Sequence, residues 1–284
     1  MFRRPVRSGS SGGSRFSLGR ILVALVIAGI SLITYFASSE FNPITGETQQ
    51  VALSPNEEIA MGLQAAPEMA QMHGGLIQDQ SMQDYLDQVC ARILNNSEAG
   101  DSDWPFECHL LADPETINAF ALPGGQVFIT DALFERLQTE GQLAGVMAHE
   151  IGHVVARHAA EQLAEQQLAQ GLSGAAVIAA YDPNNPNSGL TAAQFSALIS
   201  GLVNLKYGRD DELQSDRLGV QFMSEAGYDP RSMINVMNIL AEASGSSRQP
   251  EFFSTHPNPE NRIQRIQEAI DALYPNGVPE GLEP

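Results

Sequence analysis

The amino-acid sequence predicts a mainly helical α+β fold with a small β-sheet, preceded by one apolar helix near the N-terminus. Three observations support this prediction. Long segments after residue 54 carry apolar side chains at helical spacing. Short apolar runs between residues 106 and 130 have the length and the flanking turn residues of strands. Residues 21–37 form an uncharged apolar run that a polar segment separates from the rest of the chain.

Composition limits the classes of protein to which the chain can belong. Of its 284 residues, 43% are hydrophobic and 17% are charged, so the chain can bury a substantial core. Its net charge is −19, and binding to nucleic acid requires clustered Lys and Arg, so we expect no nucleic-acid partner. Cys90 and Cys108 are too few for a disulfide framework, and buried thiols are the simpler interpretation. A single bridge is the alternative in an oxidising compartment.

The N-terminal region has the features of a membrane anchor. Residues 1–20 are a basic tail without acidic residues, and residues 21–37, ILVALVIAGISLITYFA, are at the lower limit for a helix that crosses a bilayer. The basic tail predicts a cytoplasmic N-terminus and a large domain on the other side of the membrane. Ala37-Ser38-Ser39 is also a candidate cleavage site, which would make the run a signal peptide.

The predicted domain organisation follows from this anchor. Residues 38–53 are expected to be a linker, and residues 54–284 to form one domain. The sequence SPNE at 54–57 combines a capping box with a proline in the first turn, which predicts the start of a helix. A second helix is predicted over about residues 81–95. Strands are then expected at 106–112 and within 117–130, where Pro123-Gly124-Gly125 forms a turn.

A long helix is predicted over residues 139–170, which contain no proline and begin with a capping box. The sequence HEIGH at 149–153 lies well inside this helix. Residues 171–205 are rich in Ala, Gly, Leu and Ser, and a polar stretch interrupts them. Each apolar half is too short to span a membrane unaided, so we expect buried helices or a mobile flap over the site. The chain is completed by predicted helices at about 210–226, 229–244 and 259–273.

The HEIGH sequence has the spacing of a metal site. Two residues that are four positions apart project from the same face of a helix, so His149 and His153 can bind one metal ion. Glu150, next to His149, can accept a proton from a water molecule bound to that ion. This chemistry is typical of a zinc hydrolase that keeps one coordination position open, and it requires a third protein ligand.

Two segments compete to supply the third ligand. His158 lies on the expected continuation of the same helix, so its side chain should point well away, and we expect a structural role for it. In RDDELQSDRLG, residues 209–219, Glu212 and Asp216 are also four positions apart. A helix here could present Glu212 to the metal and Asp216 to the free N–H of a ligand histidine. The alternative is a solvated charged face.

Four stretches of the sequence occur together in one order: NAFALPGG at 118–125, HEIGHVVARH at 149–158, ELQSD at 212–216 and STHPNPENRI at 254–263. In these stretches, which span most of residues 53–275, the chain resembles family 48 of the metallopeptidases. These gluzincins include the CAAX prenyl endopeptidases, the heat-shock membrane protease, the mitochondrial inner-membrane overlapping-activity protease and bacterial periplasmic quality-control proteases.

The resemblance implies an HExxH gluzincin fold and assigns roles to individual residues. It implies one Zn²⁺ per chain, with His149, His153 and Glu212 as ligands, Glu150 as the general base and Asp216 as the residue that orients a ligand. The chain is similar to the compact, singly anchored members. It lacks the multiple membrane spans of the prenyl-processing enzymes and the tetratricopeptide repeats of some periplasmic members, so we expect neither prenylated substrates nor a dedicated partner-docking module.

Two further features have physical roles to propose. The strand around Asn118, Ala119, Phe120 and Ala121 could accept an extended substrate by main-chain pairing, the alternative being an ordinary core strand. His256 could stabilise the oxyanion or occupy the open position as a fourth ligand, which would make the resting enzyme latent. A merely packed histidine is the alternative for His256.

These features together predict a membrane-anchored zinc-dependent endopeptidase. We expect it to hydrolyse peptide bonds of unfolded or misfolded envelope proteins, as a quality-control protease with a periplasmic or otherwise extracytoplasmic catalytic domain at the inner membrane. Release into the periplasm after signal cleavage and residence in the mitochondrial inner membrane are alternatives. The competing hypothesis is a latent or inactive protease-fold protein that acts as a chaperone or binding module with structural zinc. Four protein ligands favour the competing hypothesis, and three favour catalysis.

Overall fold

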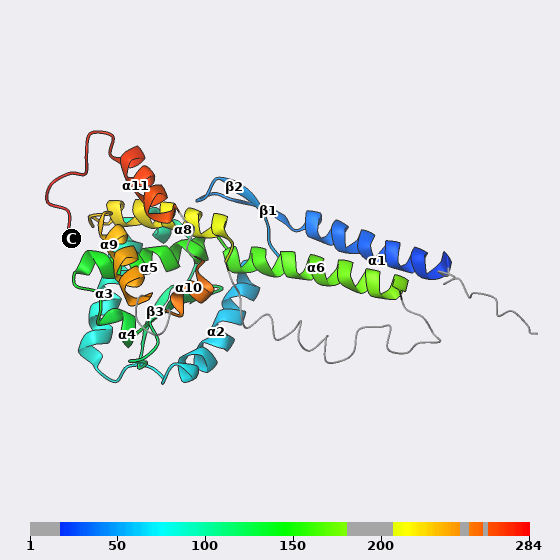
Figure 1. The fold of residues 1–284 in the computed structure, drawn as a ribbon, viewed down its shortest axis with the longest axis horizontal. Coiled ribbons are helices and arrows are strands. Elements are labelled where there is room, and N and C mark those ends of the chain that lie inside the picture. Colours follow the sequence, from blue (N-terminus) through cyan, green and yellow to red (C-terminus); the bar gives the residue numbers. More distant parts are fainter. Residues whose placement is uncertain (1–17, 181–206, 245–249, 258–260) are drawn as a thin grey trace, which may run out of the picture.

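The computed structural model describes residues 18–180, 207–244, 250–257 and 261–284 (Figure 1). The predicted mainly helical α+β class is confirmed. The N-terminal half contains α1 (Leu18–Ala37), β1 (Ser39–Asn42), β2 (Glu47–Gln50), α2 (Pro55–Met72), α3 (Gln80–Asn96), the short 3₁₀ helix η1 (Glu98–Asp101), β3 (Glu107–Leu111), β4 (Ala119–Leu122), β5 (Gln126–Thr130) and α4 (Asp131–Phe134). The remainder contains α5 (Glu140–Val155), α6 (His158–Ala180), α8 (Arg209–Glu225), α9 (Ser232–Ser244), α10 (Phe252–Thr255) and α11 (Arg262–Leu273).

Several sequence predictions fall partly outside the described residues. Most of the basic tail at residues 1–20 lies outside them, as does the larger part of the proposed flap at 171–205. The part of this flap that the structure describes, residues 171–180, is the end of the helix α6. The predicted linker at 38–53 is instead structured, because β1 and β2 pair as an antiparallel hairpin.

The predicted helix starts and strands are confirmed in most places. The carboxylate of Glu57 accepts a hydrogen bond from the Ser54 backbone N–H at 2.9 Å, so α2 begins at the predicted capping box. The central strand β5 pairs parallel with β3 and antiparallel with β4. Gly124 and Gly125 form the turn between β4 and β5 with φ of 79° and 110°, which glycine adopts at little cost.

The predicted continuous helix over 139–170 is wrong. It is two helices, α5 and α6, separated at Arg157, whose φ is 57°. The Arg157 guanidinium is nearly buried and donates to Glu58 at 2.8 Å, to Glu40 at 2.7 Å and to the Leu53 carbonyl at 2.7 Å. These partners come from α2, from β1 and from the segment before α2, so contacts distant in sequence hold Arg157 in a backbone conformation that interrupts the helix.

The buried core surrounds α5, whose residues from Gly141 to Val155 are all buried. This helix contacts α3, α8 and α9 as well as the strands β4 and β5. Around α5, the other helices of the body and the sheet form one compact unit, while α1 and α6 extend from this unit as a pair of long helices lying side by side (Figure 1). The HEIGH sequence of α5 therefore lies at the centre of the domain.

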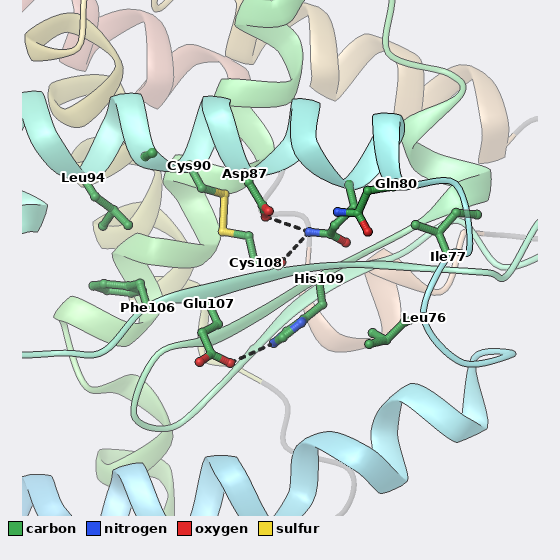
Figure 2. A pocket seen from close by; sticks show the side chains of 12 residues that line it. Leu76, Ile77, Gln80, Asp87, Cys90, Leu94, Phe106, Glu107, Cys108 and His109 are labelled. Atoms are coloured by element: carbon green, nitrogen blue, oxygen red, sulfur yellow. Dashed lines mark hydrogen bonds and ion pairs between the residues drawn. A yellow bond between two sulfur atoms is a disulfide. The ribbon is translucent and has the colours of Figure 1, made fainter.

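A disulfide between Cys90 and Cys108 joins α3 to β3, so the expectation of free thiols is wrong and the alternative of one bridge is correct. Figure 2 shows this bond beside a pocket at the outer edge of β3. At that edge the Gln83 side chain donates to the Cys108 carbonyl at 2.9 Å and accepts from the Leu110 N–H at 3.0 Å. The helix α3 thus satisfies backbone groups of β3 that the sheet leaves unpaired.

Candidate metal centre

The two helices that carry the metal-site residues approach each other closely because glycines lie between them. A Cβ atom on Gly152 of α5 would lie 3.2 Å from the Ser215 carbonyl oxygen of α8. A Cβ atom on Gly219 of α8 would lie 3.3 Å from the backbone nitrogen of His149 and 2.8 Å from the Met233 side chain. Because these two positions have no side chain, the residues on one face of α5 can contact the residues on the facing side of α8.

This approach brings His149, His153, Glu212 and His256 into one buried group whose potential ligand atoms lie within 4.8 Å of one another. The Nε2 atoms of His149 and His153 are 3.1 Å apart. The Glu212 carboxylate lies 3.6 Å from the first and 3.4 Å from the second of these nitrogens. Two imidazoles and a carboxylate converging on one point form the donor set expected for a catalytic zinc site. The sequence-predicted triad therefore comes together in space.

His256 belongs to the same group rather than being packed elsewhere. It follows the short helix α10, and its Nδ1 lies 2.9 Å from Glu212 and 3.4 Å from the Nε2 of His149. Its Nε2 faces Glu150 at 3.5 Å. Burial is the largest single effect on His256 and lowers its pKa, but Glu212 and Glu150 together outweigh it, so the pKa is raised. The position fits either role that the sequence suggested, a further metal ligand or a group beside the reacting carbonyl.

Glu150 is the buried acid next to this group. Among the residues that the structure describes, neither oxygen of Glu150 has a hydrogen-bond partner, and neither has the Nε2 of His256. Buried polar atoms are normally paired, so these atoms indicate a missing partner such as a metal ion with its water molecule. Burial is the largest effect on Glu150 and raises its pKa, although His256 and His149 act in the opposite direction. The residues present therefore fit a metal site.

Charge balance distinguishes the carboxylate of Glu212 from that of Glu150. Burial opposes ionisation of Glu212, but His256, His153 and Arg262 together hold its pKa well below the usual range. Burial also lowers the pKa of His153 far below that of a free imidazole. An ionised carboxylate beside a neutral imidazole is the protonation state that binding to a divalent metal requires.

Asp216 and Arg262 support the ligand residues from behind. The Oδ1 of Asp216 lies 3.0 Å from the Nδ1 of His149, a position from which Asp216 can orient this imidazole. Arg262 donates to both Asp216 oxygens, at 2.7 and 2.9 Å, and its Nη1 lies 2.9 Å from Glu212. Burial raises the pKa of Asp216, but Arg262 and His149 outweigh it, so the pKa is lowered. One guanidinium thus fixes two carboxylates at the centre.

The expectation that His158 points well away from the site is wrong. The break at Arg157 redirects the chain, and the Nδ1 atoms of His158 and His153 lie 2.9 Å apart. The Nε2 of His158 lies 2.8 Å from the Oε1 of Gln214. His158 is not a member of the group around Glu212, yet it contacts a member of that group directly.

The predicted substrate strand lies beside the centre. The strand β4 begins at Ala119 and contains Phe120 and Ala121, while Asn118 immediately precedes it. Within the described part of the chain, β4 pairs only with β5, which leaves its other edge without a partner strand. Tyr207 lies next to this edge, because its hydroxyl donates to the Ala121 carbonyl at 3.4 Å and its ring stacks on that of His153.

Sequence reasoning missed two residues at the centre, Arg262 and Tyr207, as well as the contact made by His158. Arg262 and His158 both lie inside stretches that carried the family resemblance, so those stretches contained the available signal. Tyr207 had no such signal. Its burial, which raises its pKa, follows from the approach of the chain before α8 to β4 and α5.

Comparison with known proteins places these features in a family context. Residues 80–270 match the sequence profile of peptidase family M48. The chain is 32% identical over 270 residues to the beta-barrel assembly-enhancing protease of Escherichia coli K12, a match that covers 91% of this chain and 54% of the relative. It is 31% identical to the mitochondrial metalloendopeptidase OMA1 of Schizosaccharomyces pombe, with 83% and 68% of the two chains covered. The chain spans about half the length of the beta-barrel assembly-enhancing proteases that it matches.

Proposed function

The chain belongs to peptidase family M48, a family of metalloendopeptidases, and we propose that it is a membrane-anchored zinc endopeptidase that cleaves unfolded or misfolded envelope proteins. The observation that carries this proposal is the buried group of His149, His153 and Glu212, beside which the Glu150 carboxylate has no hydrogen-bond partner among the described residues. Such a site supports hydrolysis of an amide bond, the reaction that the family membership implies.

The proposed mechanism assigns one task to each residue. His149, His153 and Glu212 would hold a zinc ion, which would polarise the scissile carbonyl and lower the pKa of a water molecule. Glu150 would accept the proton of the attacking water and pass it to the departing amine. Asp216 would hold the His149 ring through Nδ1, and Arg262 would hold Asp216 and Glu212 in place.

His256 supports a second candidate function. Its Nδ1 lies within the group of potential ligands, so four protein ligands are available. A site closed by four protein ligands leaves no position for a substrate and is typical of structural zinc. A latent protease, or a binding protein that holds unfolded chains, therefore remains the competing hypothesis. Substitution of His256 separates the two, as described below.

An unfolded chain suits the site because, in the part of the chain that the structure describes, β4 has no partner strand at its edge away from β5. We propose that an extended substrate lies along Asn118, Ala119, Phe120 and Ala121 and pairs with those backbone groups of this segment that point away from β5. Main-chain pairing selects extended segments with little regard to sequence, which suits quality control. One of the relatives is named for enhancing β-barrel assembly, and this name supports envelope proteins as the substrate class.

Two features support a location outside the cytoplasm. The helix α1 is long and apolar enough to cross a membrane, and most of its side chains are exposed in the structure. The Cys90–Cys108 disulfide is typical of an oxidising compartment. We propose that α1 anchors the domain on the extracytoplasmic face of an inner membrane, as the basic tail before α1 predicts. A name containing "mitochondrial" among the relatives keeps the mitochondrial inner membrane as the alternative.

The first test is cleavage of casein, an unfolded protein, by the purified full-length chain. We expect cleavage that a chelator abolishes, and Glu150→Gln should keep its zinc but lose several orders of magnitude in turnover. A Glu150→Gln variant with near-normal activity would refute the mechanism. If zinc-loaded wild type is inactive, activity gained by His256→Ala identifies a latent enzyme, whereas continued inactivity supports a binding protein.

The ligand assignment has a separate test, zinc content after gel filtration. Glu212→Ala should lose the metal because it removes one of three ligands and leaves Arg262 without that carboxylate. Asp210→Ala is the matched control, because Asp210 is an exposed acid in the first turn of α8 that belongs to neither group of potential metal ligands. Full zinc occupancy in Glu212→Ala would exclude Glu212 as a ligand.

A further inference from the structure

The helix α6 leaves the body of the protein and runs beside α1 over much of its length (Figure 1). We infer that the second half of α6 enters the lipid bilayer next to α1, so that two helices embed the protein in the membrane. This inference rests on the proposed membrane anchor, because it needs α1 to be in the bilayer. It revises the sequence-based expectation of a single anchor with a buried helix or flap after residue 171.

The contact between the two helices is close and uses small residues. A Cβ atom on Gly171 would lie only 2.0 Å from the hydroxyl of Ser31. Nearer to the body, Thr34 and Tyr35 of α1 line one hollow together with Ala164 and Leu168 of α6. Small residues that let two backbones approach are typical of helix pairs within membranes, where packing rather than the hydrophobic effect holds helices together.

The exposure of α1 follows this pairing. Ala24 is buried and Ser31 is half-buried, and the two residues lie seven positions apart, on one face of the helix. The residues on the other faces are large and apolar, and they are exposed: Leu22, Leu25, Val26, Ile30, Ile33 and Phe36. A helix with one face against a partner helix and its remaining faces apolar is suited to lipid, not to water.

The sequence of α6 changes character along its length in the way that insertion requires. Glu161 and Glu165 are its acidic residues, and no charged residue occurs between Glu165 and Ala180. Leu172 is 38% exposed although it is apolar. A helix satisfies its own backbone hydrogen bonds, so an uncharged helical segment can lie at membrane depth without unpaired polar groups.

The depth that α6 reaches follows from the antiparallel pairing. From Gly171 to the end of α6 at Ala180, the helix rises by roughly 14 Å at 1.5 Å per residue. Along α1, a similar rise from Ser31 toward the N-terminus reaches about Leu22. The end of α6 is therefore level with the start of the apolar part of α1. If α1 spans the bilayer, α6 enters most of its hydrocarbon core.

Insertion of α6 has a consequence for the active site. This helix starts at His158, which contacts His153, and its last charged residue is Glu165. The helix rises by roughly 10 Å between these two residues, so the metal centre would lie close to the membrane surface. The substrates favoured by this geometry are polypeptide segments at that surface, such as membrane proteins that have failed to insert.

The inference can be tested with single cysteine variants of the full-length chain in vesicles of phosphatidylcholine and phosphatidylglycerol. The two native cysteines are bridged and buried, so they do not react with a thiol probe without reduction. A polarity-sensitive fluorophore is attached at Leu172→Cys on α6, at Ile30→Cys on α1, or at Gln267→Cys on α11. Vesicles with and without doxyl-labelled lipid then report contact with the bilayer core.

Insertion predicts that labels at positions 172 and 30 emit at shorter wavelength and lose a comparable fraction of their fluorescence to doxyl lipid, while the label at 267 loses none. Quenching at 30 without quenching at 172 would overturn the inference and leave the anchor intact. An absence of quenching at both positions would refute the anchor and the inference together. Casein cleavage by the same labelled proteins reports separately on the proposed enzymatic activity.

Discussion

The Nδ1 of His158 lies 2.9 Å from the Nδ1 of His153, and the Nε2 of His158 lies 2.8 Å from the Oε1 of Gln214. The amide of Gln214 in turn donates to Glu47 at 2.8 Å, which fixes the orientation of its oxygen. We assign the His158 proton to Nε2, where it is donated to Gln214. The Nδ1 of His158 then accepts the proton of His153 Nδ1, which leaves the Nε2 of His153 free to bind a metal.

Removal of this contact should weaken metal binding without removing a ligand. We expect His158→Ala to lower zinc affinity by about 10- to 100-fold, the usual effect of losing a residue that orients a ligand histidine. His158→Asn should recover part of the loss, because its side-chain oxygen can accept from the Nδ1 of His153. Competition with a chromophoric chelator measures the affinity. Equal affinities for wild type and His158→Ala would show that His158 only fills space.

Arg262 should be important for folding as well as for the metal site. It is 1% exposed and pairs with Asp216 and Glu212, so Arg262→Met would leave two buried carboxylates without this partner. Loss of one member of a buried ion pair costs about 3–5 kcal/mol. Urea denaturation of the metal-free protein should show this loss of stability. The stability of Arg262→Lys should lie between those of wild type and Arg262→Met, because a lysine keeps the charge but cannot bind a carboxylate with two nitrogens at once. Wild-type stability in Arg262→Met would contradict the prediction.

The close approach of α5 and α8 can be tested with one added methyl group. A Cβ on Gly219 would meet the end of the Met233 side chain at 2.8 Å and the His149 backbone at 3.3 Å, so Gly219→Ala requires Met233 to change its conformation and α5 and α8 to separate by a few tenths of an ångström. We expect a loss of about 1–3 kcal/mol in stability and weaker zinc binding. Gly145→Ala is the control, because its Cβ would lie 3.4 Å or more from its neighbours. Equal behaviour of the two variants in denaturation and zinc titration would refute this interpretation.

Stability should depend on pH through Glu161. Burial raises the pKa of Glu161 to about 7 from an ordinary 4.5, and Asp211, Glu165 and Glu47 act in the same direction against the Gln49 hydrogen bond. Between these two values the folded protein retains a proton that the unfolded chain has lost. The contribution of Glu161 to stability is therefore complete below pH 4.5 and lost as the pH rises through about 7.

Glu161→Gln removes this titration and should unfold at a higher temperature than wild type at pH 8, by a few degrees, with a smaller difference at pH 5. Glu242→Gln on α9 is the charge-matched control, because Glu242 is exposed. Thermal unfolding of the three proteins at both pH values provides the measurement. A difference between Glu161→Gln and wild type that does not change with pH would show that the raised pKa has no effect on stability.

The fold class, the helix α2 from its capping box, and the strands on either side of Pro123-Gly124-Gly125 could be predicted from the sequence. Each depends on local chemistry: a capping carboxylate, a proline in the first turn, or glycines with positive φ. The break between α5 and α6 could not be predicted in this way. Arg157 is held there by Glu58 and Glu40, which lie about a hundred residues earlier in the chain.

The candidate site likewise has features that could be predicted from the sequence and features that could not. The spacing of His149 and His153 on one helix, and of Glu212 and Asp216 on another, was sufficient to predict that each pair shares a face, because helical periodicity is a local property. The packing of the helices decides the rest. It brings the two faces together, adds His256 and Arg262 to them, and places His158 against His153. The sequence by itself determined which residue types the candidate site offers to a metal ion and how they are spaced along each helix. Only the tertiary structure decided its supporting contacts and the pairing of α6 with α1, because these arise from contacts between segments far apart in the chain.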